Sequence, residues 1–343
     1  GSTEAINHIL RVAAFKQRDK GLGDHIITTK IEHPAVLETV KFLQHVHKFR
    51  VTYLQPDEYA MIHVTALEKA LQPDTVLVSI MHANNEVGTI NPIESLCKTA
   101  KSYNKNILFH SDTSQSIGKI HVYPKEWGLD FCVVAGHKIY APKGIGAMYI
   151  NPELKKQCID TRAYDKSDIQ EYNLLYGAKQ ENGYRPGTEN IAYCVALGKA
   201  AELSITALKF DHMATIRYLR DLLYEEIMSN IPQRYHSKIK INGHPYIKLP
   251  NTLSISFGFI RNTQITKQIF KYVACSTGAA CHSGDIQLSY VLEACGLSIN
   301  FGMGTLRLSV GRYTTEKDVM LAAKVIASAV TELYSKTRFA SKL

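Results

Sequence analysis

A regular alternation of strand and helix patterns over the first 150 residues constrains the fold more than any other feature of this chain. Short runs rich in β-branched residues, typical of strands, lie at 25–29, 51–54, 75–81, 107–110, 131–135 and 147–150. Segments with apolar residues at helical spacing separate the first four runs. The alternation predicts an α/β fold with a mostly parallel sheet sandwiched by helices, because parallel strands need crossover connections, which are nearly always right-handed.

The second half of the chain has a different pattern, which begins after an irregular, polar stretch from 151 to about 181. Helical patterns cover 192–203, 212–229, 264–272 and 316–335, and strand patterns cover 239–241, 252–257 and 306–310. This mixture predicts a second, smaller α+β domain. We expect a large domain over residues 1–205 and a small C-terminal domain over residues 206–343.

Composition indicates a globular protein and argues against several other classes. The 343 residues are 45% apolar and 21% charged, with a formal net charge of +9. The basic residues are scattered among acidic ones, so we expect no nucleic-acid partner, and no apolar run looks long enough to span a bilayer. The seven cysteines include no C-x-x-C pair, which indicates free thiols in a reducing compartment and no metal site.

The strand pattern Phe131–Ala135 ends at Gly136 and delivers His137 and Lys138 to a glycine-containing turn. Open α/β folds bind their ligands at the carboxyl edge of the sheet, where this turn would lie. A lysine buried there would have a lowered pKa and would be a nucleophile toward an aldehyde, as in a Schiff base with pyridoxal phosphate. The alternative is an ordinary solvated lysine in a turn.

Two other polar positions in the first domain fit the same cofactor. Ser2 and Thr3 stand at the start of a predicted helix, where free backbone N–H groups attract a phosphate. Either side chain could equally serve only as a helix cap. Asp112 follows a predicted strand and could keep a pyridine nitrogen protonated, although a carboxylate there also commonly caps a turn.

Three further residues follow predicted strands in the same domain. His33 could stack on the face of a ring or exchange protons with a substrate, or could be an ordinary loop histidine. Asn84 and Asn85 follow the strand pattern at 75–81, and either amide could reach a ring or a substrate. Turn formation explains these two asparagines equally well.

The second domain carries a reactive thiol candidate. Cys281 is followed by His282 and Ser283 and is surrounded by small residues, which favours an exposed loop. A thiolate in such a loop would be an accessible nucleophile, whereas a free cysteine is more often a small buried apolar residue. Arg307 stands among apolar neighbours of a predicted strand, where it could bind a substrate carboxylate or form a structural ion pair.

Taken together, these residues resemble the NifS-like members of the class V aminotransferases, the cysteine desulfurases and selenocysteine lyases. The resemblance runs through nearly the whole chain, in the blocks G-S-T-E, E-H-P-A-V, N-N-E-V-G, H-S-D-T-S-Q-S-I-G-K, G-H-K-I-Y-A-P-K-G-I-G-A, Y-R-P-G-T-E-N, G-A-A-C-H-S and L-R-L-S-V-G-R. It implies a pyridoxal phosphate-dependent transferase of fold type I. So many blocks in the same order make chance matching implausible.

The resemblance also implies which residues carry the reaction. It makes Lys138 the Schiff-base lysine and Cys281 the nucleophile that accepts sulfur or selenium. His33 would take part in catalysis beside the ring, and Asn85 and Arg307 would bind the carboxylate of the substrate.

The same resemblance implies the residues that hold the cofactor. Asp112 would pair with the pyridinium and Gln115 with the ring oxygen, and His33 would stack on the ring. Thr188 would reach the phosphate from the neighbouring subunit of a homodimer. The implied cofactor-binding residues are Ser2, Thr3, His33, Asn85, Asp112, Gln115, His137, Lys138 and Thr188.

The sequence is compatible with two activities that use this chemistry. We expect a selenocysteine lyase, which removes selenium from L-selenocysteine and leaves L-alanine, because R-P-G-T-E-N, L-P-N-T and G-A-A-C-H-S resemble that subfamily. The alternative is a cysteine desulfurase that supplies persulfide sulfur for iron–sulfur clusters or thio-cofactors, as the short spacing from Cys281 to Ser289 suggests. An aminotransferase of the same fold and a truncated, non-catalytic relative are further alternatives.

The family further implies partners and a compartment. We expect an amino-acid substrate, a homodimer and an acceptor protein for the released sulfur or selenium. Family members carry several dozen residues before the G-x-T-E motif, whereas this chain begins inside it, so we expect an incomplete chain. The expected compartment is the cytosol or, if a targeting peptide precedes the first residue, the mitochondrion.

Overall fold

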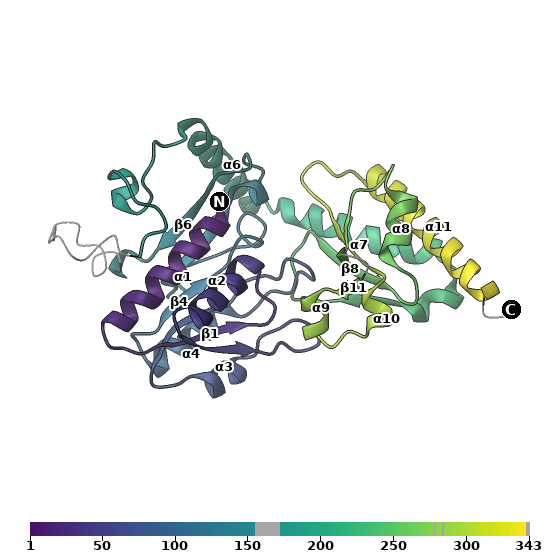
Figure 1. Ribbon diagram of the computed structural model, residues 1–343. Coiled ribbons are helices and arrows are strands. Elements are labelled where there is room, and N and C mark those ends of the chain that lie inside the picture. Colours follow the sequence, from purple (N-terminus) through teal and green to yellow (C-terminus); the bar gives the residue numbers. More distant parts are fainter. Residues whose placement is uncertain (155–171, 278, 283–284, 341–343) are drawn as a thin grey trace. The chain divides into compact units, whose positions relative to one another are not determined.

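The computed structural model describes residues 1–154, 172–277, 279–282 and 285–340, without the side chains of 279–282, 285–287 and 337–340 (Figure 1). The chain folds as two compact units. Unit 1 comprises Gly1–Gln55, Ile62–Ala83 and Asn91–Leu208, and unit 2 comprises Pro56–Met61, Asn84–Ile90 and Lys209–Leu343. A single boundary near residue 205 therefore does not describe the division, because two short segments of the N-terminal half belong to unit 2.

Unit 1 is built on a six-stranded sheet with the strand order β2-β1-β3-β4-β5-β6. Its strands are β1 (His25–Thr29), β2 (Arg50–Leu54), β3 (Thr75–Ser79), β4 (Leu108–Ser111), β5 (Phe131–Ala135) and β6 (Gly146–Ile150). The first five are parallel, and β6 runs antiparallel to β5. Strands β1 and β3 are buried along their whole length, as expected for a parallel sheet covered on both faces. The predicted α/β fold with a mostly parallel sheet is confirmed.

Helices cover both faces of this sheet (Figure 1). They are α1 (Ser2–Asp19), α2 (Pro34–His45), α3 (Val64–Ala70) and α4 (Ile93–Tyr103). Successive residues of a strand point to opposite faces, so Leu77 packs with α1 and α2 while Val78 packs with α3 and α4. The carboxyl ends of the strands, where ligands bind in such folds, are left to the connecting loops.

Helix α6 (Ile191–Lys209) is unusual because most of its apolar surface is exposed. Its buried residues are small, Ala200, Ser204 and Ala207, whereas the side chains of Val195 and Ile205 are 68% and 67% exposed. By length and composition alone this helix could cross a membrane, so the expectation that no such segment exists was wrong. A single helix that meets these criteria of length and composition is weak support for a membrane span.

Unit 2 contains a four-stranded antiparallel sheet with the order β7-β8-β12-β9. Its strands are β7 (Ile239–Asn242), β8 (Thr252–Phe257), β9 (Ser276–Thr277) and β12 (Thr305–Ser309). Helices α7 (His212–Asn230), α8 (Asn262–Ile269) and α11 (Glu316–Ala340) pack on this sheet and form one core with it.

A separate two-stranded ladder in unit 2 carries Cys281. It consists of β10 (Ala279–His282) and β11 (Asp285–Leu288) and is followed by α9 (Tyr290–Ala294) and α10 (Ile299–Gly302). In its antiparallel register Cys281 lies opposite Ile286. The sequence analysis missed these short elements because none offers an apolar period long enough to recognise.

Candidate active site

The loops that follow β1 and β3 are joined by one buried carboxyl group. Oε1 of Glu32 accepts hydrogen bonds from Thr29 Oγ1 at 2.8 Å and from the backbone N–H of Met81 at 2.9 Å. Burial, reinforced by the negative charge of Asp112, raises the pKa of Glu32 to about 8. Glu32 is therefore mainly protonated at neutral pH, and Asp112 supplies the negative charge at this edge. The sequence analysis did not identify Glu32, which stands beside His33 in the E-H-P-A-V block.

The loop after β4 presents Asp112 at the carboxyl edge of the sheet. The residue is buried, with 6% of its surface exposed, and Oδ1 accepts a hydrogen bond from the N–H of Ser114 at 2.9 Å. The backbone oxygen of Asp112 accepts from His82 N, and Thr113 Oγ1 donates to Val133 O at 2.7 Å. These bonds fix a carboxylate between the ends of β3 and β5, where it can hold a ring nitrogen in its protonated form.

Strand β5 ends in a 3₁₀ turn, η1 (Gly136–Ile139), that carries His137 and Lys138. A side chain at Gly136 would lie 2.8 Å from the carbonyl oxygen of Ile145, so only glycine allows this close approach. Partial burial and the positive charge of Lys138 lower the pKa of His137, so the imidazole is neutral at neutral pH. The two predicted residues therefore lie at the strand end, as the sequence indicated.

A second lysine, which the sequence analysis did not single out, lies near Lys138. Lys119 donates from Nζ to the backbone oxygen of Gln115 at 2.7 Å. Burial and the nearby charge of Lys138 lower the pKa of Lys119 to about 8. A side chain at Gly118 would lie 2.7 Å from Ile139 Cγ2, so the turn that bears Gln115 and Lys119 packs directly against η1. Positive charge therefore gathers at the end of β5.

The start of α1 lies against the same end of the sheet. A Cβ atom added at Gly146, which pairs with Ala135 in β5, would lie 3.0 Å from Gly1 Cα. The prediction that Ser2 or Thr3 caps this helix was wrong, because the helix begins at Ser2 and its N-cap is Gly1, with no side-chain cap hydrogen bond. The uncapped first-turn N–H groups are thus available for an anion such as a phosphate.

Two other predicted cofactor residues lie on loops of unit 1. His33 is exposed and is the N-cap of α2, where its Nδ1 accepts a hydrogen bond from the N–H of Ala35 at 3.1 Å. The backbone contact thus occupies Nδ1 and takes no part of Nε2. Thr188 is exposed on the loop before α6, and an ion pair of 2.9 Å between Arg185 and Glu4 ties this loop to α1.

The remaining predicted residues, Asn85, Arg307 and Cys281, belong to unit 2. Arg307 donates from Nη1 to the backbone oxygen of Asn85 at 2.5 Å and from Nη2 to Ser276 Oγ at 2.9 Å. Oδ1 of Asn85 is buried and has no hydrogen-bond partner among the described residues. The guanidinium of Arg307 thus lies against the backbone of Asn85, and a guanidinium is suited to bind a carboxylate. The side chain of Cys281 lies outside the described residues.

The residues of unit 1 fit pyridoxal phosphate. The uncapped start of α1 and the positive charges near His137 suit the phosphate, and the buried carboxylate of Asp112 suits the ring nitrogen. Lys138 on η1 provides the amine that the aldehyde needs. No described feature of this edge conflicts with the group.

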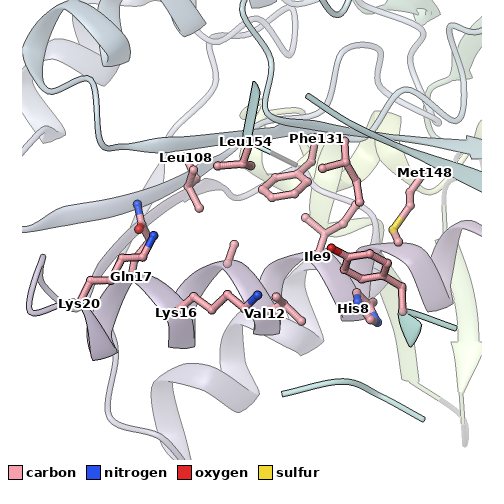
Figure 2. Close-up of a pocket in the computed structure, with 13 residues that line it drawn as sticks. His8, Ile9, Val12, Lys16, Gln17, Lys20, Leu108, Phe131, Met148 and Leu154 are labelled. Atoms are coloured by element: carbon pink, nitrogen blue, oxygen red, sulfur yellow. The ribbon is translucent and has the colours of Figure 1, made fainter. Parts of the chain in front are cut away.

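An apolar pocket in unit 1 lies elsewhere. Figure 2 shows Ile9 and Val12 of α1 facing Leu108, Phe131 and Met148 of the sheet. None of the predicted cofactor or substrate residues lines this pocket, which lies between α1 and one face of the sheet. We therefore assign the chemistry to the carboxyl edge.

A lysine on the turn after a buried strand, a buried aspartate after the neighbouring strand and an open helix start define a pyridoxal phosphate enzyme. The sequence model of the aminotransferase class-V family matches residues 1–321, and the chain belongs to this family. The protein is accordingly a pyridoxal phosphate-dependent enzyme, as the sequence analysis predicted.

Two relatives and one solved structure match this chain over nearly its whole length. The chain is 37% identical to cysteine desulfurase IscS of Dictyoglomus turgidum over 334 residues, which cover 97% of this chain and 78% of that protein. It is 39% identical to cysteine desulfurase IscS of Methanosarcina thermophila over 97% of this chain and 76% of that one. A solved structure titled NifS-like protein superposes with a TM-score of 0.81 at 34% identity, covering 96% of this chain and 80% of the other.

Proposed function

We propose that the protein is a cysteine desulfurase that removes sulfur from L-cysteine and leaves L-alanine. The observation that carries the proposal is the identity of 37% and 39%, over 97% of the chain, to proteins named cysteine desulfurase. This favours the alternative from the sequence analysis over its main expectation, the selenocysteine lyase, which stays a prediction. The grouping of Asn85 with Arg307 in unit 2 supports an amino-acid substrate with a free carboxylate.

Each residue of the site has a definable task in this reaction. When bound, pyridoxal phosphate supplies an electron sink for the bonds at the substrate Cα. Asp112 keeps the ring nitrogen protonated, and Arg307 orients the substrate carboxylate. Lys138 would bind the cofactor aldehyde, and its amine would accept the proton of the substrate Cα and later return a proton to the substrate.

Sulfur removal requires a second nucleophile. The thiolate of Cys281 attacks the sulfur of the substrate, and a new S–S bond forms as the Cβ–S bond breaks. The electron pair of the broken bond stays on the substrate carbon, which takes up a proton and becomes alanine. Cys281 is left as a persulfide, whose outer sulfur passes to a thiol or to an acceptor protein. No external oxidant or reductant is needed for this first half of the reaction.

A substrate comparison tests the proposed function. The holoenzyme is given L-cysteine or L-selenocysteine, and alanine is quantified over time. We expect sustained alanine formation from L-cysteine with a thiol reductant present. Alanine formed from L-selenocysteine but not from L-cysteine would support the selenocysteine lyase instead. Transfer of the amino group to a keto acid would indicate an aminotransferase. Absence of all three reactions would indicate a non-catalytic relative.

We also propose that the exposed apolar face of α6 contacts a second copy of this chain. The proposal is supported by the exposure of Ile191, Val195 and Ile205 and by the position of Thr188 three residues before the helix. Burying such a face contributes about 25 cal/mol per Å² of apolar surface. Val195→Lys is therefore expected to convert a dimer into a monomer in light scattering, whereas Lys199→Ala on the same helix leaves it dimeric. A wild-type monomer would contradict the proposal.

A further inference from the structure

The segment Asn84–Ile90 lies far from unit 2 in sequence but is firmly built into it. Asn84 Oδ1 accepts hydrogen bonds from the N–H groups of Glu86 and Val87 at 2.9 and 3.0 Å, which closes a tight turn. Thr89 Oγ1 donates to the backbone oxygen of Tyr59 at 2.5 Å, and residue 89 forms a β-bridge with Lys248. The turn therefore holds the carboxyl group of Glu86 in a defined position.

Glu86 makes one strong contact with a distant part of the chain. Its Oε2 accepts a hydrogen bond of 2.5 Å from Oγ of Ser289, 203 positions away in the sequence. Ser289 directly follows β11 and is the N-cap of α9, since its Oγ also accepts from the N–H of Val291 at 3.1 Å. One hydroxyl thus joins the end of the Cys281 ladder, the start of a helix and the Asn84–Ile90 turn.

The chain that enters the ladder is held at this same end, because Ala279 lies opposite Leu288 in the antiparallel register. Ser276 in β9 pairs with Arg307 in β12, and its Oγ accepts from Arg307 Nη2 at 2.9 Å. Under the proposed function Arg307 also binds the substrate carboxylate, so this contact competes with the substrate. The Ser289 contact with Glu86 uses no nitrogen of Arg307, although the charge of Arg307 acts on the Glu86 carboxyl group and partly offsets the rise of its pKa on burial. In addition, Leu288 packs on Gly302, where an added Cβ would overlap its side chain.

We propose that Glu86 is a positioning residue, which acts through Ser289 to hold the β10–β11 ladder, and with it Cys281, in place while Arg307 engages the substrate. The proposal rests on the proposed function for its catalytic meaning. A short, partly buried hydrogen bond between a hydroxyl and a carboxyl group is among the stronger contacts available to a side chain. Its loss would leave the packing of Leu288 on Gly302 as a described contact at the carboxyl end of β11.

The test measures Cys281 directly, without substrate. Iodoacetamide is added to the holoenzyme, and the rate of Cys281 alkylation is followed by peptide mass spectrometry. Glu86→Ala and Ser289→Ala are expected to alkylate at least about fivefold faster than wild type, and the double variant no faster than Ser289→Ala, because both remove the same contact and Ser289→Ala also removes the cap of α9. Glu86→Gln retains an acceptor oxygen and is expected within about twofold of wild type.

Controls separate positioning from general damage. Glu293→Ala removes an exposed carboxylate from the same helix α9 and is expected to alkylate at the wild-type rate. Ser289→Thr keeps both the cap and the donor and is expected to alkylate at the wild-type rate, and Glu86→Ala carries the test if Ser289→Ala does not fold. In L-cysteine turnover we expect kcat of Glu86→Ala to fall about tenfold while the visible cofactor band stays unchanged.

Two outcomes are distinguishable. Wild-type alkylation rates in both Glu86→Ala and Ser289→Ala, or a double variant whose effect is the product of the single ones, would overturn the positioning role. A wild-type enzyme that forms no alanine from L-cysteine, with the alkylation effects intact, would instead overturn the proposed function.

Discussion

Replacement of Lys138 by alanine is expected to abolish the visible absorption band of lysine-bound pyridoxal phosphate and to reduce alanine formation at least about a thousandfold. The amine stands on η1 at the end of β5, and it is the group that binds the aldehyde and moves the substrate proton in our account. Lys119, which lies near Lys138, donates its amine to the backbone oxygen of Gln115, and we expect it not to replace Lys138 in either task.

Lys143→Ala is the matched control for this prediction. Lys143 is exposed in the same connection between β5 and β6 and carries the same charge. We expect its replacement to leave the absorption band in place and turnover within about threefold of wild type. Both variants are checked by thermal unfolding, since loss of the band in an unfolded protein would be uninformative. A Lys138→Ala variant that still shows the band would refute the assignment.

The second large effect is expected for Cys281→Ala. This variant should lose at least about a hundredfold in sulfur removal from L-cysteine, because the nucleophile that accepts the sulfur is gone. The cofactor band should persist, since Lys138 and Asp112 belong to unit 1 and Cys281 to unit 2. Loss of sulfur removal with the cofactor band retained would show that Cys281 and Lys138 have different tasks. The Lys138→Ala variant alone cannot show this, because it is expected to lose both the activity and the band.

Cys194→Ala is the control for Cys281. Cys194 is an exposed free thiol on α6 and has no part in the proposed reaction. We expect it to behave as wild type in sulfur removal. Equal activity of Cys281→Ala and Cys194→Ala would mean that the sulfur leaves without an enzyme thiol, and the desulfurase mechanism as written would be wrong.

Much of unit 1 could be predicted from the sequence because its signals are local. The strand pattern at 25–29 coincides with β1, and Phe131–Ala135 coincides with β5. In a parallel sheet the residues that follow each strand reach the same edge, so Asp112 and Lys138 were found from strand ends alone. The sequence motifs then indicated that the cofactor is pyridoxal phosphate.

Features that depend on distant partners could not be found in this way. Glu32 looks like a surface acid in a loop, and only its burial beside Met81 reveals a protonated carboxyl group. The turn at Asn84–Ile90 reads as the end of a strand in the first domain, whereas its hydrogen bonds place it in unit 2. The contact between Glu86 and Ser289 spans 203 positions and leaves no periodic signal in the sequence.

Two expectations failed for local reasons. Ser2 and Thr3 have the chemistry of helix caps, but the helix already begins at Ser2, so their side chains lie inside the first turn. Helix α6 was overlooked as an apolar segment because charged residues such as Lys199 and Glu202 interrupt its apolar run. The mean hydropathy of the helix is nevertheless as high as that of a segment that could span a membrane. In both cases the type of one or two residues was a poorer guide to the helix than the sequence of the whole helix.

The most direct test of the central claim is the mass of the peptide that contains Cys281 after one turnover. The holoenzyme is mixed with a stoichiometric amount of L-cysteine, quenched with an alkylating agent and digested. Our account predicts one additional sulfur atom on Cys281, matched by an equal amount of alanine and absent from Lys138→Ala. Alanine without added sulfur on Cys281, or added sulfur in the absence of Lys138, would contradict it.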